Sequence, residues 1–124
     1  MAKKILIIED EAAIRDNLRR LLVLEGYAVT AEANGALGLE RARAEPPDLI
    51  LCDVMMPEMS GFEVLAALRG SPPLAQVPFI FLTASADKDS IAKGTSLGAA
   101  DYVTKPFDLL QLAALVRRRL GEAD

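Results

Sequence analysis

Short runs of apolar residues alternate along the chain with segments in which apolar residues recur every three or four positions. The apolar runs lie at residues 5–8, 49–52, 79–82 and, more weakly, 102–103, while residues 28–33 form a half-polar run. Continuous apolar runs are typical of strands buried on both faces of a parallel sheet. Helical spacing between the runs favours parallel βαβ units. We therefore expect an α/β fold of five strands and five flanking helices.

Residues that commonly start or stop helices stand at the ends of these helical segments. Gly26 follows the first segment, where a helix would take its left-handed C-terminal residue. Ser60 with Glu63 has the spacing of a capping box at the start of the third helix. Asp108 with Gln111 has a closely related spacing at the start of the fifth helix. These positions predict where the helices begin and end.

The segment at residues 87–97 is the weakest of the expected helices. Its large apolar residues are Ile91 and Leu97, and its interior contains Gly94. Glycine costs about 1 kcal/mol relative to alanine in a helix interior. We expect this helix to be loosely held, as segments that move in a switch must be.

Composition is consistent with one domain over residues 1–124. Of the 124 residues, 52% are hydrophobic and 5% aromatic, which predicts an aliphatic core. The net charge of −4 provides no broad positive field, so we expect no direct nucleic-acid partner. A membrane span needs about 20 apolar residues, far more than any run here. With no signal peptide apparent, we expect a cytoplasmic protein without membrane insertion.

Cysteine and histidine usage excludes several chemistries. Cys52 is the one cysteine and histidine is absent, which excludes an intramolecular disulfide, a cysteine zinc site and Ser-His-Asp catalysis. A metal would have to be held by oxygen atoms, and oxygen ligands favour magnesium, calcium or manganese.

Polar residues stand where the expected strands end. Glu9 and Asp10 follow the first strand, Asp53 the third, Thr83 closes the fourth, and Lys105 follows the fifth. Each has an ordinary explanation on its own, as a helix cap, a turn residue, a strand end or a solvated charge. Together they should converge, because the carboxyl ends of parallel strands form the ligand crevice.

Carboxylates gathered at such an edge repel one another unless a cation is present. Mg²⁺ binds through one or two carboxylates, which suits Asp10 and Asp53 as ligands with Glu9 assisting. Lys105 adds a second positive charge and Thr83 a hydroxyl group, an arrangement that suits a phosphoryl group. A carboxylate can then act as nucleophile and form an acyl phosphate.

Four segments make the chain closely similar to the receiver domains of bacterial two-component response regulators. The match extends over the whole chain, and the segments are specific as a set. The resemblance implies a doubly wound parallel sheet with the flavodoxin-like strand order 2-1-3-4-5. The motifs are Glu9-Asp10-Glu11, the run from Asp53 through Val54-Met55-Met56-Pro57-Glu58-Met59-Ser60 to Gly61, Leu82-Thr83-Ala84, and the run from Gly98 through Asp101-Tyr102-Val103-Thr104 to Lys105-Pro106-Phe107.

The resemblance implies roles for the acidic residues. Asp53 would be the phosphoacceptor, and Asp10 and Asp53 would bind Mg²⁺ together with the backbone carbonyl of Met55. Glu9 would contact the ion through water. Many receivers have Asp where this chain has Glu9, a substitution that leaves metal binding in place.

The resemblance also implies how phosphorylation is sensed. Thr83, Ala84 and Lys105 would bind the phosphoryl group, and Tyr102 would turn inward as Thr83 shifts. The surface of the fourth helix, fifth strand and fifth helix would then carry the signal to a downstream protein target. The isomer of the Lys105-Pro106 bond does not follow from the sequence.

The same resemblance also implies the phosphoryl donor and the limits of the catalytic activity. Without histidine, the chain needs a histidine kinase or a histidine phosphotransfer protein to supply the phosphohistidine. It would be a phosphoacceptor switch, catalysing at most its own phosphotransfer and autodephosphorylation. The kinase, the output pathway, the phosphate lifetime and any phosphorylation-linked dimer stay open. The end of the chain fits either a free-standing regulator or part of a longer one.

Three other functions compete with this interpretation. A haloacid dehalogenase-type phosphatase would place Asp two residues after its nucleophile, where this chain has Met55. Flavodoxin-like flavin binding needs a hydroxyl-rich loop where the chain has Glu9, Asp10 and Glu11. A receiver that only binds protein, without phosphorylation, would not need the acceptor, metal, threonine and lysine positions.

Overall fold

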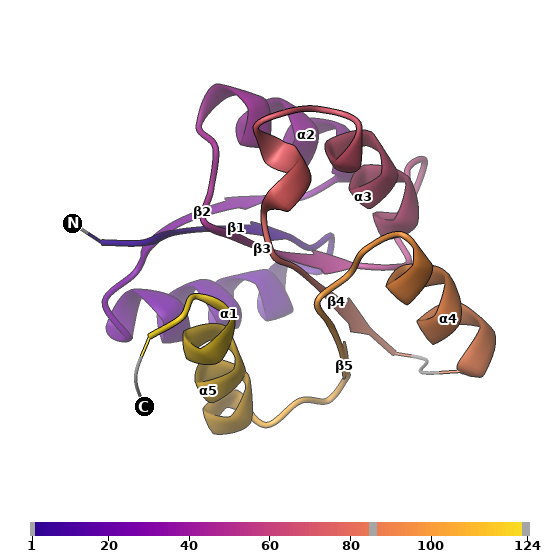
Figure 1. Cartoon of the computed structure of the whole chain (residues 1–124). Coiled ribbons are helices and arrows are strands. Elements are labelled where there is room, and N and C mark those ends of the chain that lie inside the picture. Colours follow the sequence, from indigo (N-terminus) through magenta and orange to yellow (C-terminus); the bar gives the residue numbers. More distant parts are fainter. Residues whose placement is uncertain (1, 85–86, 123–124) are drawn as a thin grey trace.

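A five-stranded parallel sheet forms the centre of the molecule (Figure 1). The computed structural model describes residues 2–84 and 87–122. The strand order β2-β1-β3-β4-β5 confirms both the expected fold and the strand order that the resemblance implied. The strands are β1 (Lys4–Ile8), β2 (Ala28–Glu32), β3 (Leu49–Asp53), β4 (Phe79–Thr83) and β5 (Asp101–Thr104).

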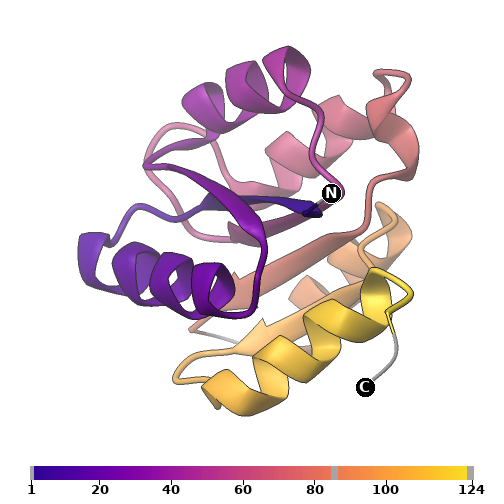
Figure 2. The same cartoon turned by 90° about the vertical axis from the view of Figure 1, so that its left-hand side faces the viewer.

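Helices cover both faces of the sheet. α1 and α5 lie together on one face, and α2, α3 and α4 on the other (Figures 1 and 2). The helices are α1 (Ala12–Leu24), α2 (Gly35–Ala44), α3 (Gly61–Arg69), α4 (Lys88–Ser96) and α5 (Leu109–Arg119), with a short 3₁₀ helix, η1 (Leu74–Gln76), before β4. No helix in the described part of the chain is both long and apolar enough to cross a membrane.

The two helical layers explain why the strand sequences are continuously apolar. Ile5 and Ile7 point to the α1 and α5 side and join the core there. Leu6 and Ile8 point to the opposite side and join the core beneath α2 and α3. Successive side chains of a strand alternate between faces, so a sheet covered on both sides needs apolar residues at every position.

The expected helix ends are confirmed. Gly26 has φ +95°, a left-handed conformation that ends α1. Ser60 and Glu63 form the complete capping box at the start of α3. The Asp108 carboxylate accepts hydrogen bonds from the first backbone N–H groups of α5, including that of Gln111. These residues define the end of α1 and the starts of α3 and α5.

Two elements carry less apolar surface than the others. α2 buries Gly35 and Gly38 beside two larger residues, so it has no clear apolar stripe. α4 buries only Gly94, in agreement with the expectation that it is loosely packed. Gly94 therefore makes the closest approach of α4 to the sheet.

Candidate functional site

The five polar residues singled out above lie at the carboxyl edge of the sheet. Glu9 and Asp10 follow β1, Asp53 ends β3, Thr83 ends β4 and Lys105 follows β5. Because β1, β3, β4 and β5 are consecutive neighbours in the sheet, these strand ends form one continuous edge. The structure thus places the predicted residues along one side of the molecule.

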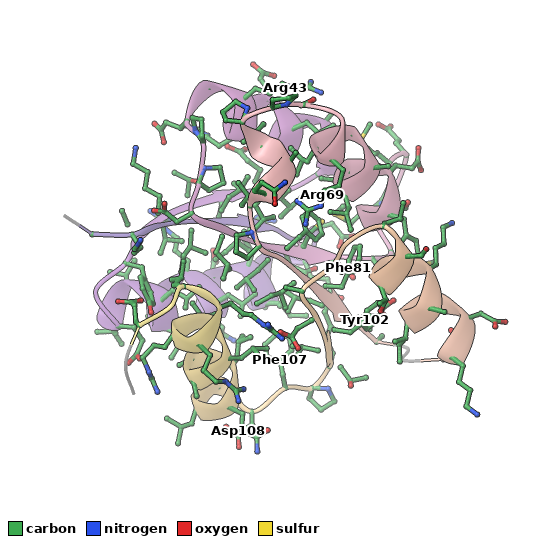
Figure 3. All side chains as sticks on the ribbon, viewed as in Figure 1. Arg43, Arg69, Phe81, Tyr102, Phe107 and Asp108 are labelled. Carbon is green, nitrogen blue, oxygen red and sulfur yellow. The ribbon has the colours of Figure 1, made fainter. Side chains whose placement is uncertain are left out.

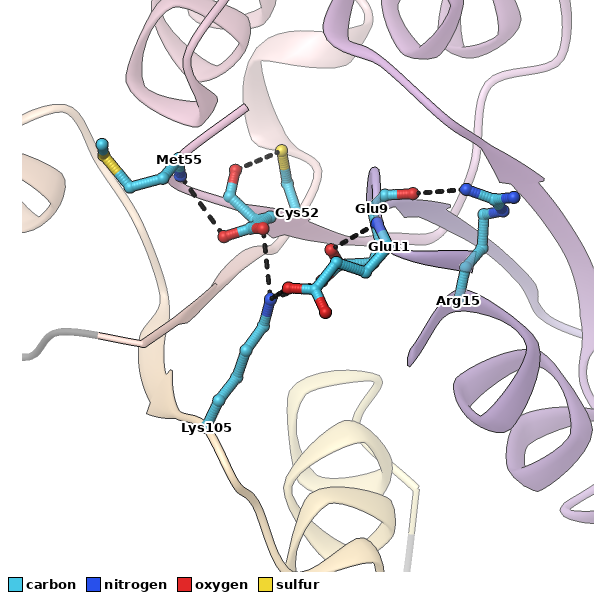
Figure 4. A network of polar contacts seen from close by, with 7 residues as sticks. Glu9, Glu11, Arg15, Cys52, Met55 and Lys105 are labelled. Atoms are coloured by element: carbon cyan, nitrogen blue, oxygen red, sulfur yellow. Dashed lines mark hydrogen bonds and ion pairs between the residues drawn. The ribbon is translucent and has the colours of Figure 1, made fainter. Parts of the chain in front are cut away.

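Lys105 connects the two ends of this row. Its ammonium nitrogen Nζ lies 3.1 Å from Asp53 Oδ2 and 2.8 Å from Glu9 Oε1, as the dashed contacts of Lys105 in Figure 4 show. Glu11 Oε1 is farther away, at 3.9 Å. The Lys105 side chain is 13% exposed, so water screens these charges only partly.

Glu9 is held from several directions. One carboxylate oxygen, Oε2, accepts a hydrogen bond of 3.1 Å from the Glu11 N–H. Arg15 Nη1 donates a bond of 2.9 Å to the Glu9 carbonyl (Figure 4). Burial raises the pKa of Glu9 to about 7, although the Lys105 ammonium lowers it, and the Asp53 charge adds to the increase.

The acidic residues fit a hard divalent cation. One carboxylate oxygen from each of Glu9, Asp10 and Asp53 lies within 4.8 Å of the other two. Glu9 Oε1 is buried and receives no well-directed hydrogen bond from the described residues, despite its short contact with Lys105. Glu9 Oε1 therefore already faces the positive charge of Lys105, and an all-oxygen donor set of three carboxylates suits Mg²⁺.

The loop after β3 folds back over Asp53. The Met55 N–H donates to Asp53 Oδ1 over 3.3 Å, and the Gly61 N–H donates to the Val54 carbonyl over 2.8 Å. A Cβ atom at Gly61 would lie 2.3 Å from the Asp53 carbonyl oxygen, so glycine is needed for this approach. The Met55 side chain is exposed, and the metal contact expected of its carbonyl stays a prediction.

The residues expected to sense phosphorylation lie on β4 and β5. Thr83 is buried at the end of β4, and its carbonyl accepts a hydrogen bond of 2.7 Å from the Lys105 N–H. Ala84 is exposed beside Lys105, in an apolar pocket between α1 and the β5–α5 loop. The Lys105-Pro106 bond is cis.

Tyr102 points inward in this structure. Its ring centroid lies 5.4 Å from that of Phe81, and both rings are labelled in Figure 3. The Tyr102 hydroxyl is buried and has no hydrogen-bond partner among the described residues. Packing against the Phe81 ring holds the Tyr102 side chain in this position.

Sequence reasoning did not find Arg15 or Arg69. Arg69 donates three hydrogen bonds of 2.8 to 3.0 Å, to the carbonyls of Ala75, Val77 and Gly98. Arg15 also binds a carbonyl, that of Glu9. Every residue carries a carbonyl, so no residue type elsewhere in the chain signals these contacts.

Comparison with known proteins assigns the family. The family model described as the response regulator receiver domain matches residues 5–117. The chain therefore belongs to the response regulator receiver domain family. Receivers of this family are phosphoacceptor switches in two-component signalling, and membership favours this function over the phosphatase and flavin-binding alternatives.

Individual proteins agree with the family. The chain is 42% identical over 122 residues to the transcriptional regulatory protein CseB of Streptomyces coelicolor, covering 96% of this chain and 51% of CseB. The chemotaxis protein CheY4 of Vibrio cholerae is 30% identical with a TM-score of 0.92, covering 95% of this chain and 98% of CheY4.

A third relative was solved with a metal. The receiver domain of the sensor histidine kinase PA1611 from Pseudomonas aeruginosa, with a magnesium ion in its active-site cleft, is 29% identical with a TM-score of 0.90. The match covers 98% of this chain and 100% of that receiver. In contrast, the chain spans about half the length of the transcriptional regulators that it matches.

Proposed function

We propose that the chain is a phosphorylation-dependent signalling switch in which Asp53 accepts a phosphoryl group from the phosphohistidine of a histidine kinase or a histidine phosphotransfer protein. One observation carries the proposal: Asp53 Oδ2 lies 3.1 Å from Lys105 Nζ at the sheet edge where the other two acidic residues also gather. Asp53 is a buried nucleophile that lies between the positive Lys105 ammonium and the other carboxylates. Such a position suits transfer of a dianionic phosphoryl group.

The phosphotransfer needs little from the protein beyond positioning. An Asp53 carboxylate oxygen forms the new P–O bond while the P–N bond to the donor imidazole breaks, and the bonding electrons stay on the imidazole nitrogen, which takes up a proton. The Met55 N–H orients Oδ1 and Lys105 lies against Oδ2. After the transfer, the Lys105 ammonium can pair with the negatively charged phosphoryl oxygens.

Glu9, Asp10, Asp53 and the Met55 carbonyl are the groups that would hold Mg²⁺. When bound, the ion supplies positive charge that offsets the repulsion between the acidic side chains and the incoming phosphoryl group. The three carboxylate oxygens that lie within 4.8 Å of one another support this assignment.

Signalling would proceed through Thr83 and Tyr102. Thr83 and the Ala84 backbone would contact the phosphoryl group, and Tyr102 would change the surface formed by α4, β5 and α5. A protein target or a second phosphorylated copy would recognise that surface. No direct contact with nucleic acid is proposed for this chain, although CseB, about twice as long, is named a transcriptional regulator. A histidine kinase donor fits the expected cytoplasmic location.

Intact-mass measurement with a small-molecule phosphodonor and Mg²⁺ tests the proposal. The wild type should gain one phosphoryl group, and Asp53→Asn should gain none. Glu45→Gln is the matched control, because Glu45 is an exposed acidic residue after α2 and outside the three-carboxylate group, and it should be phosphorylated normally. Equal phosphorylation of Asp53→Asn would refute the acceptor assignment. If the phosphodonor adds no phosphoryl group to the wild type and beryllofluoride does not bind, the chain is a receiver that acts by protein binding alone.

A further inference from the structure

Phe81 in β4 lies at the centre of an aromatic group beneath α3 and α4. Its side chain is fully buried, and its ring centroid lies 5.1 Å from that of Phe62, 5.0 Å from Phe79 and 5.4 Å from Tyr102. Interplanar angles of 49° to 65° give edge and tilted contacts. Such a group resists displacement of its central ring.

Two glycines lie against opposite edges of the Phe81 ring. A Cβ atom added to Gly61 would be 3.0 Å from Phe81 Cε1 and 2.3 Å from the Asp53 carbonyl oxygen. A Cβ atom added to Gly94 would be 3.0 Å from Phe81 Cε2 and 3.1 Å from Tyr102 Cε2. The ring therefore fills the space between the backbone at Asp53 and the backbone of α4.

Few other contacts between α4 and the rest of the molecule are present among the residues that the structure describes. Gly94 is its buried residue, Lys93 Nζ lies 4.8 Å from the centroid of Phe62, and Arg69 binds the Gly98 carbonyl just beyond the helix. The position of α4 over the sheet is thus determined largely by how closely Gly94 approaches Phe81 and Tyr102.

We propose that Gly94 is a positioning residue that sets the distance of α4 from the Phe81 and Tyr102 rings, and that this distance determines how readily Tyr102 stays inward and Asp53 binds a phosphoryl group. The proposal rests on the function proposed above. It adds that Phe81 and Gly94 couple the position of α4 sterically to the response expected of Thr83 and Tyr102.

A methyl group at Gly94 would require one of its neighbours to move. Phe81 is enclosed between two glycines and two other rings and has no free space. Tyr102 is only partly buried, and Gly94 is the buried residue of α4 among those that the structure describes. Gly94→Ala should therefore displace Tyr102 or lift α4. Because coupling between sites is reciprocal, phosphoryl binding should weaken when the inward state is disfavoured.

¹⁹F NMR of the full chain labelled with 3-fluorotyrosine tests this. The chain has 2 tyrosines, so Tyr27→Phe assigns the Tyr102 signal. Wild type, Gly94→Ala and Gly70→Ala would be titrated with beryllofluoride in the presence of Mg²⁺. Gly70 is the control, because its added methyl group would meet nothing closer than 3.8 Å.

Gly94→Ala should shift the Tyr102 signal in the free protein and weaken beryllofluoride binding about 5-fold or more, the lower end of typical allosteric coupling. Gly70→Ala should match the wild type. Phe81→Leu removes the ring atoms nearest Gly94. In that background, the loss of beryllofluoride affinity caused by Gly94→Ala should fall below about 2-fold, because substitutions at residues in contact are not additive.

Either of two results would overturn the proposal. The first is an unchanged Tyr102 signal and an unchanged beryllofluoride affinity in Gly94→Ala. The second is that Gly94→Ala lowers the affinity equally with and without Phe81→Leu. If Gly94→Ala is too unstable to titrate, recovery of folding in the double variant supports the packing claim, and no recovery refutes it. A wild type that does not bind beryllofluoride instead refutes the proposed function, and the Tyr102 signal of the free Gly94→Ala protein still decides the packing claim.

Discussion

Lys105 reaches across β4 to Asp53, with 3.1 Å between Nζ and Oδ2 and 52 positions between the two residues in the chain. β3 and β5 are not neighbours in the sheet, so the contact spans a whole strand. The same ammonium lies 2.8 Å from Glu9 Oε1. One cation therefore balances two buried carboxylates at the edge where three acidic residues meet.

Lys105→Met should leave those carboxylates without their positive partner. We expect the free energy of unfolding to fall by about 1–3 kcal/mol, the cost of leaving a buried polar partner unsatisfied. Phosphorylation should slow by about 100-fold or more, as when one charge-stabilising group is lost. Urea unfolding and phosphorylation kinetics measure the two effects. Lys3→Met, at an exposed position, is the control. An unimpaired phosphorylation rate would remove Lys105 from the site.

Mg²⁺ should stabilise the folded chain through the acidic residues. At a concentration ten times its Kd, the ion should add about 1.4 kcal/mol to the free energy of unfolding, because it binds the folded state alone. Asp10→Asn should lose most of this stabilisation, whereas Glu45→Gln, at an exposed position outside the carboxylate group, should keep it. Thermal unfolding with and without Mg²⁺ tests the expectation, and an equal response of both variants would contradict the metal assignment.

Arg69→Met should destabilise the fold although Arg69 lies outside the proposed site. Three hydrogen bonds to carbonyls and a partly buried guanidinium are lost together, which should cost about 2–4 kcal/mol. Arg69→Lys should recover less than half of this loss, because an ammonium cannot reproduce the planar fork.

Arg43→Ala is the control for Arg69. Arg43 is exposed on α2, so the substitution should change stability by less than about 0.5 kcal/mol. Urea unfolding compares the variants. Full recovery by Arg69→Lys would show that charge, rather than the three directed bonds, is what Arg69 contributes.

The sequence predicted the fold and the composition of the site because both depend on repeated, local patterns. Continuous apolar strands indicate a sheet covered on both faces, and parallel strands bring residues such as Asp53 and Thr83 to one edge. The strand order did not follow from those patterns and came from the family resemblance.

Other features depend on shape and could not be read from residue types. α2 was counted but not located, because Gly35 and Gly38 take the place of large apolar residues on its buried face. In the sequence, Phe81 is one of several apolar strand residues, and Gly94 indicates only a weak helix. The role proposed for them follows from how closely α4 approaches the Phe81 ring at Gly94, which only the folded chain defines.

Tyr27 should make stability depend on alkaline pH. The Tyr27 hydroxyl donates a hydrogen bond of 2.8 Å to Glu122 Oε1. Burial, with this bond and the Glu122 charge, raises its pKa to about 12. An unfolded tyrosine ionises near pH 10, so the stabilising contribution is complete below about pH 10 and is lost as the pH rises towards 12.

Unfolding in urea at several alkaline pH values measures this dependence, and absorbance at 295 nm follows tyrosine ionisation. Tyr27→Phe should show a smaller fall in the free energy of unfolding between about pH 10 and 12. The same fall in both proteins would place the alkaline sensitivity elsewhere in the chain.

The most direct test of the central claim is to identify the phosphorylated residue chemically. After treatment with the phosphodonor and Mg²⁺, borohydride reduction converts an aspartyl phosphate into homoserine, which peptide sequencing by mass spectrometry locates. We expect homoserine at position 53 and nowhere else. Homoserine at position 10, or a phosphate on a hydroxyl residue that survives reduction, would contradict it.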